Sequence, residues 1–317
     1  MTGGGRRPEH TANAEVAIGN KRLKLSNLEK VLYPKAGFTK AQVIDYYLRV
    51  SETLLPHLRD RPLTLKRYPN GVDQPFFYEK NCPSHRPSWV RTAAVYSESN
   101  RRTMQFCLVN DVATLVWAAN LADLELHVPL AKAPAMDRPT QMVFDLDPGE
   151  PANLVQCCEV GVLLRGMFDS LGLVSFAKTS GSKGLQVYVP LNQAKVTYDD
   201  TKSFSRAVAE LLEREKPKLV VSNMKKTLRT GKVLVDWSQN DPHKTTVCVY
   251  SLRAKDQPTV STPVTWEEVE ACTAHRDPER LTFDSESALA RIKKRGDLFA
   301  ELLELKQALP QLSQKKI

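Results

Sequence analysis

The sequence lacks the features of membrane and secreted proteins. No apolar run in its 317 residues approaches the ~18 residues needed to cross a bilayer. The N-terminus contains two arginines but no apolar segment after them, so it does not match a secretory signal. We therefore expect no membrane partner, and a flexible leader over residues 1–20.

Cysteines are few, and none forms the Cys-x-x-Cys pair that many zinc sites use. The six cysteines are at positions 82, 107, 157, 158, 248 and 272. Cys157 and Cys158 are adjacent in an apolar helical pattern, which indicates buried free thiols. Reduced thiols in a chain without a secretory signal predict a cytoplasmic protein.

Internal repeats and long low-complexity linkers are also missing. With 42% hydrophobic and 26% charged residues the chain can build a core, which excludes fully disordered and collagen-like proteins. The 45 basic residues outnumber the 36 acidic ones, so the net charge is +9. This excess favours a polyanionic partner such as nucleic acid. Residues 216–235 contain six basic residues and no acid, and a solvated loop is the alternative there.

Helical and strand patterns alternate along the chain. Thr39 and Gln42 form a capping-box pattern, which predicts a helix from there to about residue 58. Further helices are expected over 110–121 and 153–170, from Asp199 or Asp200 to 215, and through most of the chain after 266. Strands are expected at 22–25, 62–80 (two, with a turn), 141–144, 173–178, 185–189, 233–237 and 247–251. The proline- and serine-rich segment 81–100 is expected to be irregular.

Strands and helices intermixed in this way predict an α/β or α+β fold with a mixed sheet. No clean linker divides the chain. We therefore expect two lobes around one cleft within a single catalytic domain, residues 21–310, followed by a basic tail, 311–317.

The strongest local signal is the pair Asp145 and Asp147 at the end of an apolar strand. Alternate residues of a strand point to the same face, so both carboxylates project together. Two like charges this close are costly unless a cation lies between them, and oxygen ligands suit Mg²⁺ or Mn²⁺. The alternative is that one carboxylate caps the turn at Pro148 and Gly149.

Two further segments favour phosphate chemistry. Residues 179–184 lie between two predicted strands, and their glycines, hydroxyls and lysine could form an anion-binding nest. An ordinary hairpin turn is the alternative. Asp236 ends another apolar strand, and Arg253 follows 17 residues later. Three carboxylates with basic groups suit nucleotidyl transfer by two metal ions.

The motifs DLDPG, SGSKGLQVYVP, VDWSQN and YSLRA follow in this order. As an ordered set they resemble the archaeo-eukaryotic primase superfamily, and most of all the polymerase domain associated with bacterial ATP-dependent DNA ligase D. The resemblance extends from about residue 21 to 309. It implies a primase-polymerase fold, with a mixed central sheet flanked by helices, in a bacterial protein associated with the nucleoid.

The resemblance implies roles in catalysis and nucleotide binding. Asp145, Asp147 and Asp236 match the catalytic ligands of two metal ions, with Mn²⁺ preferred. The residues expected at the nucleotide are Ser180, Gly181, Ser182, Lys183, Gln186, Arg253 and His127. The family usually has histidine at position 186, and glutamine cannot become cationic or move a proton. A structural role for His127 is the alternative.

The resemblance also implies contacts with DNA. Lys30 and Lys40, with Asn27 beside them, match lysines that hold a 5′-phosphate at a gap or break, and Lys40 lies at a helix N-terminus that favours phosphate. A solvated surface is the alternative for both lysines.

Phe76 and Phe77 match a pair that stacks on template bases. Lys66 and Arg67, on the preceding strand, are candidates for contacts with DNA or the nucleotide. Core packing is the alternative for the two phenylalanines.

The implied function is a template-dependent DNA/RNA polymerase that fills short gaps or extends ends at 5′-phosphorylated breaks, with NTP or dNTP and a ribonucleotide preference. No ligase or nuclease segment fits in 317 residues, so we expect the protein to stand alone. A separate ATP-dependent DNA ligase would then seal the product, in non-homologous end joining with Ku or in excision repair.

Three other classes are weaker alternatives. A polymerase-like module that binds DNA ends with weak catalysis is supported only by Gln186. A phosphatase with an Asp-x-Asp motif needs threonine or valine where Gly149 stands. A glycosyltransferase would leave Lys30, Lys40 and Arg253 unexplained.

Overall fold

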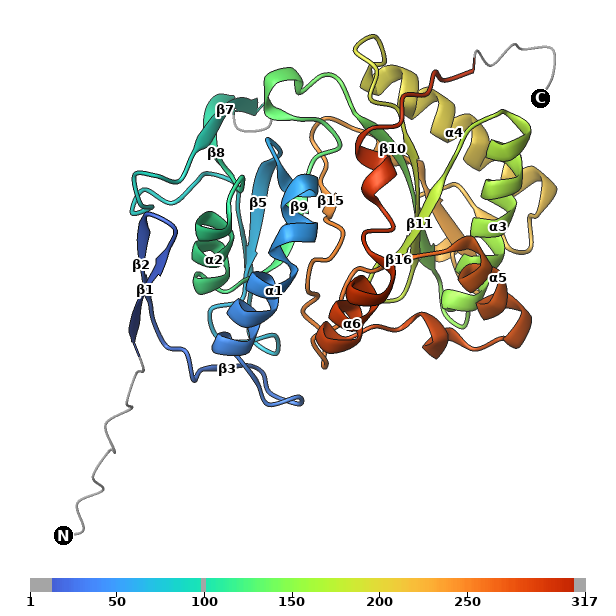
Figure 1. Cartoon of the computed structure of the whole chain (residues 1–317). Coiled ribbons are helices and arrows are strands. Elements are labelled where there is room, and N and C mark those ends of the chain that lie inside the picture. The colour runs from blue at the N-terminus through green and yellow to red at the C-terminus, as the bar shows by residue number, and fades with distance from the viewer. Residues whose placement is uncertain (1–12, 98–100, 311–317) are drawn as a thin grey trace.

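The structure is a computed structural model that describes residues 13–97 and 101–310 (Figure 1). The expected basic tail, 311–317, and most of the expected leader lie outside these residues. The described part of the leader contains β1 (Ala14–Ile18), which pairs with β2 (Lys21–Leu25) in an antiparallel ribbon. None of the helices within the described ranges is long and apolar enough to span a membrane.

Most strands belong to two six-stranded sheets that lie side by side (Figure 1). The first sheet has the order β15-β9-β5-β8-β7, with β6 paired to β5, and its strands pair antiparallel. Its strands are β5 (Pro62–Arg67), β6 (Phe77–Glu79), β7 (Thr92–Ser97), β8 (Arg102–Leu108), β9 (Asp123–Val128) and β15 (Thr246–Val247). A small ribbon of β3 (Val31–Tyr33) and β4 (Phe38–Thr39) precedes it.

The second sheet has the order β13-β14-β10-β12-β11-β16. It is mixed, because β13 pairs parallel with β14 while the other pairs are antiparallel. Its strands are β10 (Gln141–Pro148), β11 (Phe176–Thr179), β12 (Leu185–Pro190), β13 (Val220–Val221), β14 (Val233–Asp236) and β16 (Pro263–Val264). The α/β class and the mixed sheet are as predicted, with the strands divided between two sheets.

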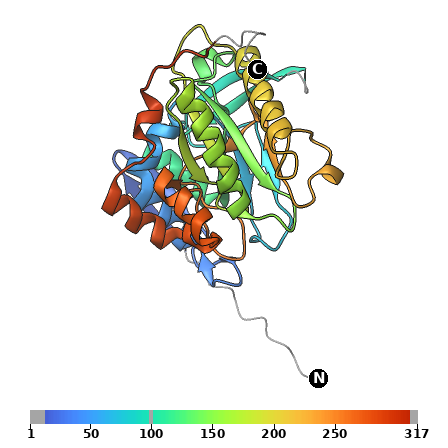
Figure 2. The same cartoon turned by 90° about the vertical axis from the view of Figure 1, so that its right-hand side faces the viewer.

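Helices cover one face of the second sheet and leave the other face toward the first sheet. The described helices are α1 (Lys40–Leu58), α2 (Val112–Asn120), α3 (Leu154–Ser170), α4 (Tyr198–Glu215), α5 (Trp266–His275) and α6 (Ser285–Arg295). Figure 2 shows α3, α4 and α5 in front of the second sheet. Phe144 and Leu146 of β10 pack in the core beneath these helices, whereas Asp145 and Asp147, one residue out of phase, point to the opposite face.

Each lobe has its own apolar cluster, but the clusters are not divided by sequence. The cluster around α1, α2 and the first sheet also contains Val143, Tyr188 and Val260 from the second half of the chain. Strand β15 likewise comes from the second half and completes the edge of the first sheet beside β9. The two lobes are therefore joined by shared packing and by a shared strand.

The predicted helices are confirmed, with one correction. Thr39 and Gln42 form the expected capping box, and α2 and α3 lie where the sequence placed them. Helix α4, however, begins after Thr197 and not at Asp199 or Asp200. The Thr197 hydroxyl accepts from the Asp200 backbone, and the Asp200 carboxylate accepts from the Thr197 backbone.

Three other expectations are wrong in part. Segment 81–100 is not irregular throughout, because residues 92–97 form β7 by pairing with β8. The strand expected at 247–251 is short, because Tyr250 adopts a positive φ of 61°. The expectation of reduced thiols is wrong for Cys82 and Cys107, which form a disulfide. A hydrogen bond from the Cys82 backbone N–H to the Gln105 carbonyl places residue 82 against β8. The other four cysteines are free and buried.

Asn240 holds β10 where β14 no longer reaches it. Pairing with β14 begins at Asp145, and Val143 has no strand partner on that side. The fully buried Asn240 side chain takes this place: its Oδ1 accepts from Val143 N (2.9 Å), and its Nδ2 donates to Val143 O (2.7 Å). The amide therefore fixes the strand two residues before Asp145.

Asn240→Ala should destabilise the protein by roughly 2–4 kcal/mol, because two buried backbone groups of Val143 lose their partner. Urea unfolding measures the loss. Asn13→Ala, at an exposed asparagine, is the control and should change stability by less than about 0.5 kcal/mol. Equal stability of the two variants would contradict this role of Asn240.

Candidate active site

A row of polar side chains crosses four neighbouring strands of the second sheet. Lys178 of β11 is opposite Gln186 of β12, Gln186 is opposite Asp145 of β10, and Asp145 is opposite Asp236 of β14. Residues opposite each other share a face with Cβ atoms about 4.5–5.5 Å apart. The Gln186 amide donates from Nε2 to Asp145 Oδ1 over 3.0 Å. The register therefore sets the order of charges along the row.

The structure brings the three predicted carboxylates together. Asp147 is two residues after Asp145 on the same face of β10, and Asp236 lies beside Asp145 on the next strand. Asp145 and Asp147 line an open cleft of about 990 Å³, whose opposite side includes His127 of the first sheet. The convergence of segments 91 residues apart in sequence (from 145 to 236) is a consequence of the antiparallel pairing of β10 and β14.

Burial and mutual repulsion shift the protonation of this cluster. Burial and the charge of Asp147 raise the pKa of Asp145 to about 7, against the hydrogen bond from Gln186. Burial and the charge of Asp236 also raise the pKa of Asp147, while Arg229 and Arg253 act in the opposite direction. A bound cation would relieve the repulsion, since it favours the charged form of each carboxylate.

The donor set fits a hard divalent cation by its chemistry. Carboxylate oxygens are the ligands that Mg²⁺ and Mn²⁺ prefer. Asp236 is ordered by its neighbours: Oδ1 accepts from Ser238 N (2.9 Å), and Oδ2 accepts from Gln239 Nε2 (3.0 Å). Within the described ranges, no group of three or more acidic, histidine or cysteine side chains is already arranged to hold a metal ion.

The segment 179–184, here called the glycine loop, lies directly against the acidic cluster. A Cβ on Gly184 would come within 2.2 Å of Leu146 O and 3.7 Å of Asp147 Oδ1, so only glycine permits this approach. Gly181 has a φ of +66°, and a Cβ there would lie 2.8 Å from the Arg253 side chain. The loop is thus placed next to Asp147 and Arg253.

The inner donors of the glycine loop are engaged within the loop. Ser180 Oγ accepts from Ser182 N (3.2 Å) and from Gly184 N (3.1 Å), as in a tight hairpin. Arg253 donates to Ser180 O. Lys183 pairs with Glu150 (2.8 Å), and both side chains are exposed at the rim of the cleft. These bonds match the hairpin alternative, and the Ser180, Lys183 and Arg253 side chains line the cleft beside this turn.

His127 and Arg253 meet at a buried carboxylate. Glu125 Oε2 lies 3.0 Å from His127 Nε2 and 3.4 Å from Arg253 Nε. Burial lowers the pKa of His127 in spite of Glu125, which favours the neutral ring. The imidazole lines the cleft with one nitrogen committed to Glu125.

Lys40 is buried, which excludes the solvated alternative for this lysine, whereas Lys30 is exposed. Lys40 Nζ donates to Ser26 O (2.6 Å), and Lys30 Nζ donates to Asn70 Oδ1 (2.9 Å). Burial, with the charges of Lys30 and Arg67, lowers the pKa of Lys40 to about 8. Asn27, with a φ of 54°, shapes the turn that precedes Lys30. This cluster of positive charge is suited to an anion.

Phe76, Phe77 and Tyr78 form an exposed surface that we call the aromatic platform. Their exposed fractions are 47%, 44% and 56%, so core packing is wrong for both phenylalanines. Lys66 Nζ lies 4.6 Å from the Phe76 ring centre, and the Arg67 guanidinium lies 5.1 Å from that of Phe77. The two basic residues therefore support the platform.

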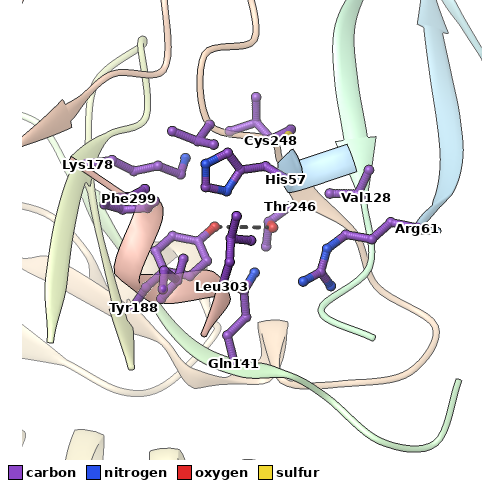
Figure 3. Close-up of a pocket in the computed structure, with 13 residues that line it drawn as sticks. His57, Arg61, Val128, Gln141, Lys178, Tyr188, Thr246, Cys248, Phe299 and Leu303 are labelled. Atoms are coloured by element: carbon purple, nitrogen blue, oxygen red, sulfur yellow. Dashed lines mark hydrogen bonds between the residues drawn. The ribbon is translucent and has the colours of Figure 1, made fainter. Parts of the chain in front are cut away.

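Sequence analysis missed several residues of the cleft. Arg229, in the basic run 216–235, lines it, as do Gln239, Thr245 and Thr246. The basic run gave a signal for Arg229, whereas nothing in the sequence distinguished the two threonines. A second pocket is lined by Lys178 and Tyr188, together with His57 and Arg61 (Figure 3). There the Tyr188 hydroxyl bonds Thr246 (3.3 Å) and Gln186 Oε1 (3.2 Å), which orients the Gln186 amide toward Asp145.

Fold and site define a class: a two-sheet α/β protein with an acidic cluster that faces a glycine loop in a basic-rimmed cleft. A sequence model of the LigD primase-polymerase domain matches residues 39–299. The chain therefore belongs to the LigD primase-polymerase domain family, which confirms the resemblance drawn from the motifs.

Individual relatives agree with this assignment. The multifunctional non-homologous end joining protein LigD of Mycolicibacterium smegmatis is 42% identical over 284 residues, covering 89% of this chain and 36% of that protein. The bifunctional non-homologous end joining protein LigD of Bacillus subtilis is 32% identical over 289 residues, covering 91% and 45%. This chain thus spans less than half the length of these relatives.

One solved structure is similar to this chain over nearly the whole length of both. It is the polymerase domain from Mycobacterium tuberculosis ligase D in complex with DNA, with a TM-score of 0.83 and 41% identity. The match covers 90% of this chain and 99% of that chain.

The raised pKa of Asp145 predicts a pH-dependent stability. The carboxyl titrates near 3.8 in the unfolded chain and at about 7 in the folded protein. The folded state holds the extra proton between these values, so the metal-free protein should lose stability as the pH rises through that window. Asp145→Asn removes the charge and should raise the melting temperature at pH 8 by several degrees, with little effect at pH 4.

Thermal unfolding in EDTA measures this difference, with exposed Asp169→Asn as the control. Adding Mn²⁺ at pH 8 should stabilise the wild type and not Asp145→Asn, because ligands stabilise only the state that binds them. If Asp145→Asn were less stable than the wild type at pH 8 without metal, this would contradict the repulsion between Asp145 and the neighbouring carboxylates.

Proposed function

We propose that this chain is a template-dependent nucleotidyltransferase, a DNA/RNA polymerase of the primase type. Its substrates would be NTP or dNTP and DNA with a short gap or a broken end. The observation that carries the proposal is the convergence of Asp145, Asp147 and Asp236 beside the glycine loop. Carboxylates, a phosphate-binding loop and a basic rim are the parts that nucleotidyl transfer needs.

Asp145, Asp147 and Asp236 would hold two divalent ions, Mn²⁺ or Mg²⁺. Such ions supply a clamp for the attacking 3′-oxygen and the leaving pyrophosphate. Gln186 orients Asp145 through its amide, and Ser238 and Gln239 orient Asp236. The chain thereby fixes the carboxylates before the substrate arrives, which lowers the cost of reorganisation.

The incoming nucleotide would lie between the glycine loop and the first sheet. Ser180, Lys183 and Arg253 would bind its triphosphate, with Gly181 and Ser182 keeping the loop tight. His127 faces the same cleft and would lie near the sugar, where a neutral imidazole can accept or donate one hydrogen bond. A ribonucleotide preference belongs to this proposal.

DNA would be held on the other side of the cleft. Lys30 and Lys40, positioned by the turn at Asn27, would bind a 5′-phosphate at the downstream edge of the gap. The platform of Phe76 and Phe77 would stack on template bases, since base–aromatic stacking tolerates any sequence.

The setting would be DNA repair in a bacterial cytoplasm, at the nucleoid. The relatives named above are non-homologous end joining proteins, which supports end joining, with Ku and a DNA ligase as partners. Excision repair with a separate ligase is the second setting. A DNA-end-binding module with weak catalysis is the alternative function, and Gln186 in place of the usual histidine is the feature that favours it.

A gap-filling assay tests the proposal. The wild type, given Mn²⁺, nucleotides and a primer–template with a short gap, should extend the primer. Asp145→Ala/Asp147→Ala should lower the rate on the order of 10³-fold or more, because the metal ligands are lost. Asp45→Ala/Asp169→Ala, at two exposed aspartates, is the matched control. Full activity of the active-site double variant would remove the metal assignment, and binding without extension by the wild type would favour the module.

The lysine cluster makes a separate prediction. Lys30→Ala/Lys40→Ala should abolish the preference for a gap with a 5′-phosphate, while extension of a substrate without that phosphate continues. The control is Lys35→Ala, an exposed lysine of the neighbouring turn that pairs with Asp256. The readout is the ratio of kcat/KM with and without the phosphate. A ratio unchanged from the wild type would exclude this binding site.

A further inference from the structure

Glu125 is a buried carboxylate at the meeting point of the cleft and the aromatic platform. It lies on β9 directly opposite Lys66 of β5, and its exposed fraction is 1%. Glu125 Oε2 contacts three basic groups: Lys66 Nζ at 3.0 Å, His127 Nε2 at 3.0 Å and Arg253 Nε at 3.4 Å. One charge is thus shared by groups from three separate segments.

The second oxygen of Glu125 is also engaged. Oε1 accepts from Ala254 N (3.0 Å) and lies 3.4 Å from the Tyr68 hydroxyl. Burial acts to raise the pKa of Glu125, but His127, Arg253 and Lys66 together hold it well below its usual range. The carboxylate is therefore charged, and it offsets the repulsion between the cations around it.

Arg253 and Lys66 connect Glu125 to two different parts of the molecule. Arg253 donates to Ser180 O of the glycine loop, on the side of the triphosphate. Lys66 Nζ faces three rings, with centres at 4.6 Å for Phe76, 5.4 Å for Tyr68 and 5.8 Å for Tyr78. A cation among aromatic faces is attracted to each of them, so Lys66 fixes where the rings lie.

Glu125 therefore connects the glycine loop to the platform through two short contacts. Arg253 and Lys66 share the single charge of Glu125. A shift of Arg253 toward a bound triphosphate would therefore leave more of that charge to Lys66. A base that stacks on the platform would shift the rings that Lys66 faces, and with them the position of Lys66 relative to Glu125. Two ligands that bias one shared arrangement influence each other's affinity equally.

We propose that Glu125 is a positioning residue that couples binding of the incoming nucleotide to stacking of the template base on the aromatic platform. The inference rests on the proposed function, in which these two ligands meet at the cleft. Glu125 itself touches neither ligand. Its effect passes through Arg253 on one side and Lys66 on the other.

Binding measurements test the coupling without requiring turnover. Affinity for a non-hydrolysable NTP with Mn²⁺ is measured with gapped DNA that carries either the complementary template base or an abasic site. In the wild type the complementary base should tighten NTP binding by about 10-fold. In Glu125→Gln, which keeps the size and the acceptor oxygen, this factor should fall several-fold, to the part that base pairing with the NTP supplies by itself.

The matched control is Glu268→Gln. Glu268 also holds arginines, Arg291 and Arg295, but lies on α5 away from the cleft. This variant should lose comparable ion pairs and keep the wild-type coupling factor. Lys66→Met is the second variant, in case Glu125→Gln does not fold: it leaves Glu125 with His127 and Arg253 and should also lose the coupling.

The outcomes separate the inference from the proposed function. Extension by the wild type together with an unchanged coupling factor in Glu125→Gln would overturn the inference and leave the polymerase assignment intact. Coupling in the wild type that Glu125→Gln loses, without any primer extension, would support the inference and overturn the assignment. A coupling factor of about 1 in the wild type would overturn the inference directly.

Discussion

Repulsion among three carboxylates on one face of a sheet is the constraint around which the molecule is organised. Asp145, Asp147 and Asp236 are brought together by the pairing of β10 with β14, at a cost that raises the pKa of two of them. The surrounding structure opposes that cost with hydrogen bonds to Asp145 and Asp236 and with the charges of Arg229 and Arg253. A site of this kind is unfavourable alone and favourable with a cation.

The arrangement of the helices explains why this face can be open. α3, α4 and α5 lie on one side of the second sheet and bury the alternate side chains of β10. The first sheet supplies the other wall of the cleft, with His127 on β9 and the platform beyond β5. The acidic cluster and the aromatic platform thus lie on different sheets, and Glu125, with its contacts to Arg253 and Lys66, lies between them.

The sequence predicted what local pattern controls. The capping box at Thr39 and the alternation in β10 are short-range features, so the start of α1 and the paired direction of Asp145 and Asp147 were correctly expected. The approach of Asp236 was expected from the chemistry that three carboxylates suit and from the resemblance, because pairing between distant strands leaves no local signature.

Long-range partners explain most of what the sequence did not predict. β7 forms because β8 pairs with it, and β7 has no strong apolar alternation of its own. The disulfide between Cys82 and Cys107 depends on the same docking of residues 82 and 105. The role of Glu125 was invisible because two of its basic partners, Lys66 and Arg253, come from distant segments. A solvated surface remained an alternative for Lys40 at the level of sequence, because its burial depends on a contact with Ser26 that the fold creates.

Strand β15 has a consequence for how the chain can evolve. Residues 246 and 247 leave the second lobe to complete the first sheet against His127 and Val128. A first lobe made without them would expose the backbone of β9 as an unprotected edge open to self-association. Gene fusion or shuffling could therefore add modules outside this unit, but could not exchange one lobe without the other.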